Sequence, residues 1–275
     1  MTLTGDAARS AISPWVNPVT RALREGRVCV GACTLAFPSG GVGQLFAEAG
    51  FSWLYMDMEH SQLTYDGIRD ICVASKLAGI VPVAGPTSLA DHLVARPLDA
   101  GAMGVIAPHV QTADQAADVV RWSRYPPIGS RGLIGFGDLT GFREVDTGEW
   151  VKAQNREVLV AVKIESVVGI DNVDEIASVP GLDAILIGPG DLSTTMGIPG
   201  QTKHPDVRDA ILKMLAAAKR HGVAGGPHVG APEEVASWAA EGATLMAYSF
   251  DAGMLLEASK QAVGEARRLL GDRML

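Results

Sequence analysis

Two carboxylates stand at the ends of apolar runs in this sequence. Glu165 closes the run VAVKIE, and Asp191 lies in the turn IGPGDLS. A carboxylate at the end of a buried strand is costly unless it is paired, protonated or bound to a metal. Oxygen ligands from two neighbouring strand ends suit a hard divalent cation such as Mg²⁺ or Mn²⁺. A helix cap at Asp191 and an ion pair between Glu165 and an arginine explain the same residues equally well.

Further titratable groups follow or precede these positions. His60 ends the segment MDMEH, where neighbouring carboxylates favour a general base, although a solvated loop histidine is the plainer interpretation. Lys163 stands two residues before Glu165 and therefore shares its face of the strand. It can pair with Glu165, stabilise a substrate oxyanion or form a Schiff base, and we favour the first two. His109 and His228 follow apolar runs and are expected to line a pocket without acting on protons.

The elements that position these residues repeat along the chain. Apolar runs predict strands at 27–34, 53–57, 81–85, 104–107, 158–164, 183–187, 223–226 and 244–249. Helical spacing of apolar residues predicts helices at 65–78, 89–100, 112–122, 168–178, 205–221 and 231–241. Strands buried on both faces and alternating with helices are typical of a parallel sheet.

This pattern favours one (β/α)₈ TIM barrel over residues 1–275, with an open doubly wound sheet as the competitor. In a barrel, chemistry belongs at the C-terminal ends of the strands, where the residues above do fall. A long irregular segment at 124–154, rich in Gly and Pro, is expected to be a loop that acts as a lid or a subunit contact.

Composition limits the partners and the compartment. The formal net charge is −8, from 23 Lys and Arg against 31 Asp and Glu, which argues against nucleic acid or an anionic membrane as partner. No apolar run is long enough for a membrane span, and the N-terminus lacks the pattern of a signal peptide. Cys29 and Cys33 lie roughly 13 Å apart on an extended strand, too far for a disulfide. With Cys72 they are expected to be reduced, which predicts a cytoplasmic protein.

Several segments together resemble one known family. They are GFSWLYMDMEH, LDAGAMGVIAPHVQTADQA, RYPPIGSRG, VKIES, IGPGDLS and GATLMAYSFDAG. On these segments the chain resembles the HpcH/HpaI aldolases, metal-dependent pyruvate aldolases related to 2-keto-3-deoxy sugar-acid aldolases, over roughly residues 20–260. The resemblance implies a (β/α)₈ barrel that assembles as a hexamer, a trimer of dimers, in which the last helix is exchanged between neighbouring subunits.

The resemblance also implies roles for particular residues. The metal ligands fall on Glu165 and Asp191, the base on His60, and the aspartate that partners this histidine on Asp99. The metal, Mg²⁺, Mn²⁺ or Co²⁺, is expected to chelate the keto and carboxylate oxygens of the 2-oxo acid. Backbone amides at Gly190 and Asp191 are expected to cradle the carboxylate.

One departure from the family pattern concerns the substrate site. The family commonly reads V-V-R-P where this chain has Val83-Ala84-Gly85-Pro86, so Gly85 stands in place of an arginine. Loss of such an oxyanion donor typically costs about 10²–10³ in rate. The family also commonly has Gln where this chain has Lys163, so compensation between the two positions and a changed substrate are both open. Gly85 and Pro108 are expected to line the substrate site.

The predicted function is a carbon–carbon lyase that carries out reversible aldol cleavage or addition of pyruvate or a related 2-oxo acid with an aldehyde. Two alternatives keep the same deprotonated substrate: decarboxylation of oxaloacetate, and a Claisen-type condensation of the citrate-synthase kind. A third alternative is a barrel that binds metal and a small acid without turnover, for which the missing arginine is the only support.

Overall fold

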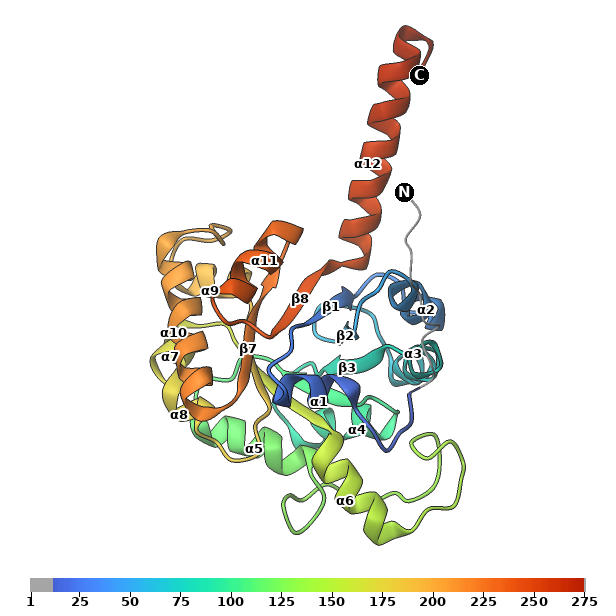
Figure 1. Cartoon of the computed structure of the whole chain (residues 1–275), viewed down its shortest axis with the longest axis vertical. Coiled ribbons are helices and arrows are strands. Elements are labelled where there is room, and N and C mark those ends of the chain that lie inside the picture. The colour runs from blue at the N-terminus through green and yellow to red at the C-terminus, as the bar shows by residue number, and fades with distance from the viewer. Residues whose placement is uncertain (1–11, 275) are drawn as a thin grey trace.

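A closed barrel of eight parallel strands forms the centre of the molecule in the computed structural model, which describes residues 12–274. The strands follow one another around the barrel in chain order. Figure 1 labels β1, β2, β3, β7 and β8 of this barrel. Their bounds are β1 Cys29–Thr34, β2 Trp53–Asp57, β3 Val81–Gly85, β4 Gly104–Ala107, β5 Leu159–Ile164, β6 Ala184–Ile187, β7 Ala224–Val229 and β8 Leu245–Phe250. The predicted (β/α)₈ barrel is confirmed, and the open sheet is excluded because β1 pairs with β8.

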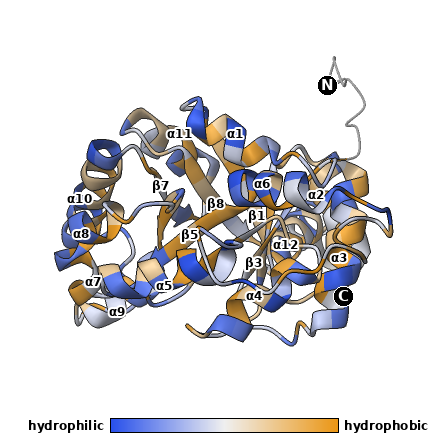
Figure 2. Cartoon of the chain, turned by 90° about the horizontal axis from the view of Figure 1, so that it is seen from below, coloured by the Kyte–Doolittle hydropathy of each residue, from blue (hydrophilic) through white to orange (hydrophobic). Residues whose placement is uncertain are grey.

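Helices surround the barrel and carry both hydrophilic and hydrophobic residues (Figure 2). Their bounds are α1 Pro18–Arg24, α2 Gly40–Glu48, α3 Tyr65–Ala78, α4 Asp91–Asp99, α5 Ala113–Ser123, α6 Thr147–Glu157, α7 Val167–Asp171, α8 Val173–Ala177, α9 Pro189–Thr195, α10 Pro205–His221, α11 Pro232–Ala240 and α12 Asp251–Leu270, before the short 3₁₀ turn η1 Gly271–Arg273. The helix predicted at 168–178 is two short helices, α7 and α8, that meet at Asn172. No helix of the described residues is both long and apolar enough to cross a membrane.

The segment 124–154 is only partly irregular, which corrects the sequence prediction. Helix α6 begins at Thr147 because Asp146 caps it, accepting a hydrogen bond from the backbone N–H of Glu149 at 2.8 Å. The buried Trp150 then anchors the helix. The Gly-rich stretch before the cap conceals this start in the sequence. The irregular loop therefore ends at residue 146.

Alternate residues of each strand pack on opposite sides of the barrel wall. Trp53 and Tyr55 of β2 point into the barrel, whereas Leu54 and Met56 pack outward against the helices. Gly31 of β1 makes room for the indole, since a Cβ there would lie 2.3 Å from the ring of Trp53. The barrel interior is therefore filled with large side chains below its C-terminal end.

The three cysteines are free and buried, as expected. Burial is the main cause that raises the pKa of each thiol above its ordinary value. The thiols therefore behave as core side chains and take no part in a disulfide.

Helix α12 leaves the barrel and projects far from it (Figure 1). Along this helix only Asp251 is buried, while Leu255, Leu256, Val263 and Leu269 are exposed. An apolar helix face without a cover within its own chain is typical of a contact between subunits. Exchange of this helix between neighbours remains a prediction.

Asp251 ties the end of β8 to the loop that follows β1. Its buried carboxylate accepts a hydrogen bond from Thr34 Oγ1 at 2.7 Å. It also accepts bonds from the backbone N–H groups of Leu35, Ala36 and Phe37 at 3.0–3.2 Å. This charged acceptor with several donors links the segments that follow β1 and β8, the first and last strands, at the C-terminal end of the barrel.

We predict that Asp251→Ala lowers the free energy of unfolding by about 3 kcal/mol, because buried donors lose their charged acceptor. Chemical denaturation measures the loss. The control is Glu265→Ala on the same helix, an exposed residue paired with Arg268, which should leave the midpoint unchanged. Equal midpoints for the Asp251 variant and the unsubstituted protein would contradict the assignment.

Candidate functional site

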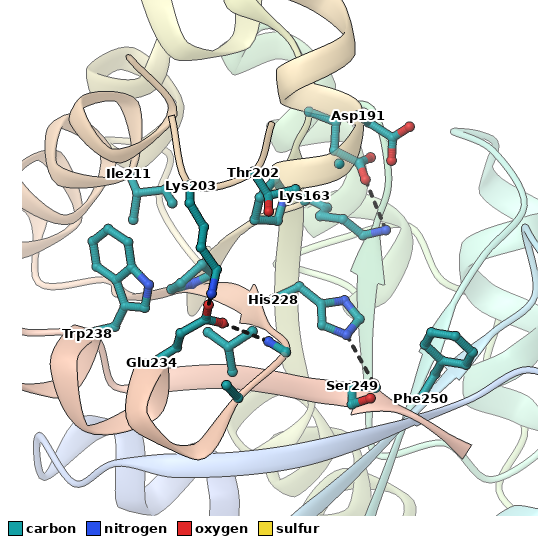
Figure 3. Close-up of a pocket in the computed structure, with 18 of the residues that line it drawn as sticks. Lys163, Asp191, Thr202, Lys203, Ile211, His228, Glu234, Trp238, Ser249 and Phe250 are labelled. Carbon is teal, nitrogen blue, oxygen red and sulfur yellow. Dashed lines mark hydrogen bonds and ion pairs between the residues drawn. The ribbon is translucent and has the colours of Figure 1, made fainter. Parts of the chain in front are cut away.

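A cavity of about 840 Å³ opens at the C-terminal ends of the strands. Residues at the ends of five strands line it: Leu35 after β1, Asp57 of β2, Lys163 of β5 with Glu165 directly after it, Gly188 to Asp191 after β6, and His228 of β7. Ser249 and Phe250 of β8 and residues of α10 and α11 complete the wall (Figure 3). This is the face at which α/β barrels carry their active sites.

The two carboxylates expected to bind metal both line this cavity. Glu165 is buried, and a Cβ on Gly188 would lie 2.5 Å from its Oε1, so the glycine leaves the room that this carboxylate needs. Asp191 lies in the first turn of α9, where Gly188 holds the capping position and no side chain caps the helix. The helix-cap interpretation of Asp191 is therefore wrong.

These donors fit a hard divalent cation. Glu165 and Asp191 offer carboxylate oxygens to one cavity, and Asp191 extends into it (Figure 3). The described residues contain no group of three or more His, Cys, Asp or Glu placed to enclose a metal. A site with two protein ligands leaves the remaining positions to water and substrate oxygens, as magnesium sites commonly do.

Lys163 is the cation next to Glu165, one of the two expected metal ligands. Its Nζ lies 3.1 Å from Glu165 Oε1, which confirms the expected ion pair with the side chain two residues later (Figure 3). Burial acts to lower the pKa of this ammonium, but the negative charges of Glu165 and Asp57 act to raise it, and the pKa lies above its ordinary value. A Schiff base requires a neutral amine, so this environment opposes one.

His60 is half exposed and lines the cavity. Asp57 positions it, because Asp57 Oδ1 accepts hydrogen bonds from the backbone N–H groups of Glu59 and His60, both at 2.9 Å. The Nε2 of His60 lies 3.6 Å from Glu59 Oε2. The aspartate and glutamate that precede this histidine thus form a turn that presents the imidazole to the cavity.

His109 lies beside Glu165, one of the two expected metal ligands, which the sequence does not indicate. Its Nε2 lies 2.7 Å from Glu59 Oε1 and its Nδ1 3.3 Å from Glu165 Oε2. Its backbone N–H also donates to Glu165 Oε2 at 3.2 Å, in a left-handed conformation with φ of 55°. His109 therefore links the two glutamates, a role for which its place directly after Pro108 and β4 is the only sequence signal.

His228 offers a neutral acceptor to the cavity. Its Nε2 lies 3.1 Å from the carbonyl oxygen of Ser249, which can only accept, so Nε2 carries the proton (Figure 3). Burial is the main cause that lowers the pKa of this imidazole. The ring is therefore neutral at pH 7 and Nδ1 keeps its lone pair. The expectation that His228 lines the pocket is confirmed.

Asp99 does not accompany His60 within one chain. It ends α4, which runs from the C-terminal end of β3 back to the start of β4 and so brings Asp99 to the opposite end of the barrel. There Asp99 pairs with the buried Arg131, whose Nη2 and Nε lie 2.6 and 3.2 Å from Asp99 Oδ1. The expected Asp99–His60 pair is therefore not formed inside a single barrel.

The expected substrate-binding residues divide into two groups. Gly190 and Asp191 line the cavity, and their backbone lies in the first turn of α9, where N–H groups have no partner inside the helix. Pro108 follows β4 and Gly85 ends β3, and neither is among the residues that line the cavity. Gly85 instead lies against the side chain of Tyr55.

Comparison with known proteins places this barrel among relatives. The model of the HpcH/HpaI aldolase/citrate lyase family matches residues 44–258. The hydroxypyruvate/pyruvate aldolase of Roseobacter denitrificans is 33% identical over 246 residues, which cover 89% of this chain and 95% of the relative. The 2-keto-3-deoxy-L-rhamnonate aldolase of Escherichia coli is 32% identical over 245 residues, with coverage of 89% and 91%.

A solved structure agrees with these sequence matches. The crystal structure of the HpcH/HpaI aldolase from Desulfitobacterium hafniense superposes with a TM-score of 0.86 at 33% identity, covering 91% of this chain and 97% of that one. Matched residues, identity and fold agree along most of the chain. The chain belongs to the HpcH/HpaI aldolase/citrate lyase family.

Proposed function

We propose that this protein is a carbon–carbon lyase that catalyses reversible aldol cleavage and addition between a 2-oxo acid and an aldehyde. The observation that carries the proposal is the pair Glu165 and Asp191, which offers oxygen ligands to one cavity beside the ammonium of Lys163. The names of the relatives, aldolases of hydroxypyruvate, pyruvate and a 2-keto-3-deoxy acid, support this substrate class.

A divalent metal held by Glu165 and Asp191 would supply a Lewis acid for the keto oxygen of the substrate. The position of Gly190 and Asp191 in the first turn of α9 supports binding of the substrate carboxylate by their backbone N–H groups. His60 takes the methyl proton in the addition direction, because it lies at the cavity and is held by the turn at Asp57. The ammonium of Lys163 offsets the negative charge that develops on the substrate.

The native assembly and compartment belong to the same proposal. A homo-oligomer, with a hexamer as the expected form, would cover the exposed apolar residues of α12. Buried, free thiols at Cys29, Cys33 and Cys72 support a reducing compartment such as the cytoplasm.

The function is tested with pyruvate and hydroxypyruvate against a panel of aldehydes, each with Mg²⁺, Mn²⁺ or Co²⁺. We expect aldol product with at least one donor and aldehyde, and none after chelation of the metal. Carbon dioxide released from oxaloacetate, with no aldol product from any pair, would instead indicate a decarboxylase. No turnover of any substrate would favour a binding protein.

The first site prediction concerns the metal ligands. Glu165→Gln keeps the size of the side chain but removes its charge, so we expect Mn²⁺ affinity to fall by more than about 100-fold, beyond the usual effect of residues outside the ligand set. Calorimetry on the metal-free protein measures the affinity. Asp174→Asn, on the far exposed surface of α8, is the matched control and should bind Mn²⁺ like the unsubstituted protein. Unchanged affinity in the Glu165 variant would exclude it as a ligand.

The second site prediction separates proton transfer from metal binding. His60→Ala should lower kcat by about 10²–10⁴, the usual contribution of a general base, with Mn²⁺ affinity within a few-fold of the unsubstituted protein. His92→Ala, which removes an exposed histidine of α4 outside the cavity, is the control and should leave kcat unchanged. Full activity of the His60 variant would show that another group accepts the proton.

A further inference from the structure

Gly85 and Tyr55 compete for one volume at the barrel mouth. Tyr55 of β2 pairs in register with Val83 of β3, two residues before Gly85. Its side chain is buried inside the barrel, and a Cβ on Gly85 would lie 2.1 Å from Tyr55 Oη and 2.5 Å from Cζ. Carbon atoms do not approach so closely, and a buried ring cannot move aside cheaply. The phenol therefore occupies the space through which an arginine at position 85 would have to pass.

The position of the hydroxyl places it beside the residues of the site. Gly85 pairs in register with Asp57, so an oxygen next to Gly85 lies at the level of a residue that lines the cavity. The ring of Tyr55 is centred 5.5 Å from Lys163 Nζ. Burial is the main cause that raises the pKa of this phenol, so it stays protonated and can donate a hydrogen bond.

Tyr55 lies two residues before Asp57 on β2, just below the residues that line the cavity, and its hydroxyl takes no part in the hydrogen bonds of the described residues. The ring packs edge-on against Trp53, with centroids 6.5 Å apart, and lies near Lys163. No side chain or backbone group of residues 12–274 forms a hydrogen bond with Tyr55 Oη. A tyrosine that only filled the barrel would gain nothing from a polar atom at this place, and phenylalanine would serve equally well.

We propose that Tyr55 donates a hydrogen bond to the keto oxygen of the bound 2-oxo acid, while Lys163 supplies the positive charge. The two residues together take over the task that the family pattern assigns to an arginine at the position of Gly85. This inference rests on the proposed aldolase function. It also explains the sequence change at Gly85, since the glycine is required by the ring that replaces the guanidinium.

Tyr55→Phe tests the proposal because it keeps the ring and removes only the hydroxyl. We expect kcat/KM for aldol cleavage to fall by about 10²-fold, as for loss of one oxyanion donor. Binding of oxalate, a planar mimic of the enolate, to the Mg²⁺-loaded protein should weaken by at least tenfold, with Mg²⁺ affinity and the thermal midpoint unchanged. Tyr125→Phe is the matched control, because Tyr125 is an equally buried tyrosine packed against Arg131, away from the cavity.

A second experiment tests the shared volume in the metal-free protein. Gly85→Arg alone should lower the thermal midpoint strongly, because the new side chain meets the phenol. Tyr55→Leu keeps the interior apolar and frees that space, so Tyr55→Leu with Gly85→Arg should regain much of the lost midpoint. After Mg²⁺ is added back, the double variant should also exceed both single variants in kcat/KM. If the effects of the two substitutions on the thermal midpoint simply add, the inference that side chains at positions 55 and 85 occupy the same space is overturned.

The outcomes separate this inference from the proposed function. If the unsubstituted protein forms no aldol product and binds no oxalate with any metal, the proposed function fails. If the unsubstituted protein is active and Tyr55→Phe matches it in kcat/KM and oxalate affinity, the assignment of Tyr55 fails while the function stands.

Discussion

Glu165 is a carboxylate held almost out of solvent directly after β5, a strand in which Lys163 is the one residue that is not apolar. Three groups make this tolerable: the ammonium of Lys163 at 3.1 Å, and the backbone N–H and Nδ1 of His109 at 3.2 and 3.3 Å. A buried charge without such partners would be protonated or would destabilise the barrel. The mouth of the barrel is built around this one group, since Gly188 leaves its space and Asp191 lies beyond it in the same cavity.

The need to balance the buried charge of Glu165 relates the departures from the family pattern at Lys163 and Gly85 to one another. A lysine in place of the family's glutamine puts a cation beside Glu165, and the arginine expected on β3 is absent. Under the proposal for Tyr55 and Lys163, one cation on β5 serves in place of one on β3, because two cations beside one bound metal would repel. Tyr55 fills the volume that Gly85 leaves and contributes a donor without a second charge. The strands of the barrel are those of the family, whereas the positions of the positive charge and of the hydrogen-bond donor differ from the family pattern.

Much of this arrangement was predictable from sequence. Buried parallel strands have continuous apolar runs, so all eight strands were predicted. The prediction ended the seventh strand at residue 226, whereas β7 extends to Val229, because Gly225, Gly226 and Pro227 weaken the apolar pattern without breaking the strand. Tyr55 was not predicted, since an aromatic residue in a strand resembles core and only the approach to Gly85 distinguishes it. The distances around His109 and the place of Asp99 depend on how helices return across the barrel, which residue spacing alone does not give.

Deprotonation of the substrate methyl group is the step on which this account depends, and proton exchange measures it without any aldehyde. Pyruvate in D₂O, followed by ¹H NMR with the protein and Mg²⁺, should lose its methyl signal at a rate that rises with protein concentration. Chelation of the metal should stop the loss, because the charge on the keto oxygen then has no Lewis acid. Exchange that continues at the same rate after chelation, or its absence with Mg²⁺, Mn²⁺ and Co²⁺ alike, would contradict a metal-dependent 2-oxo acid lyase.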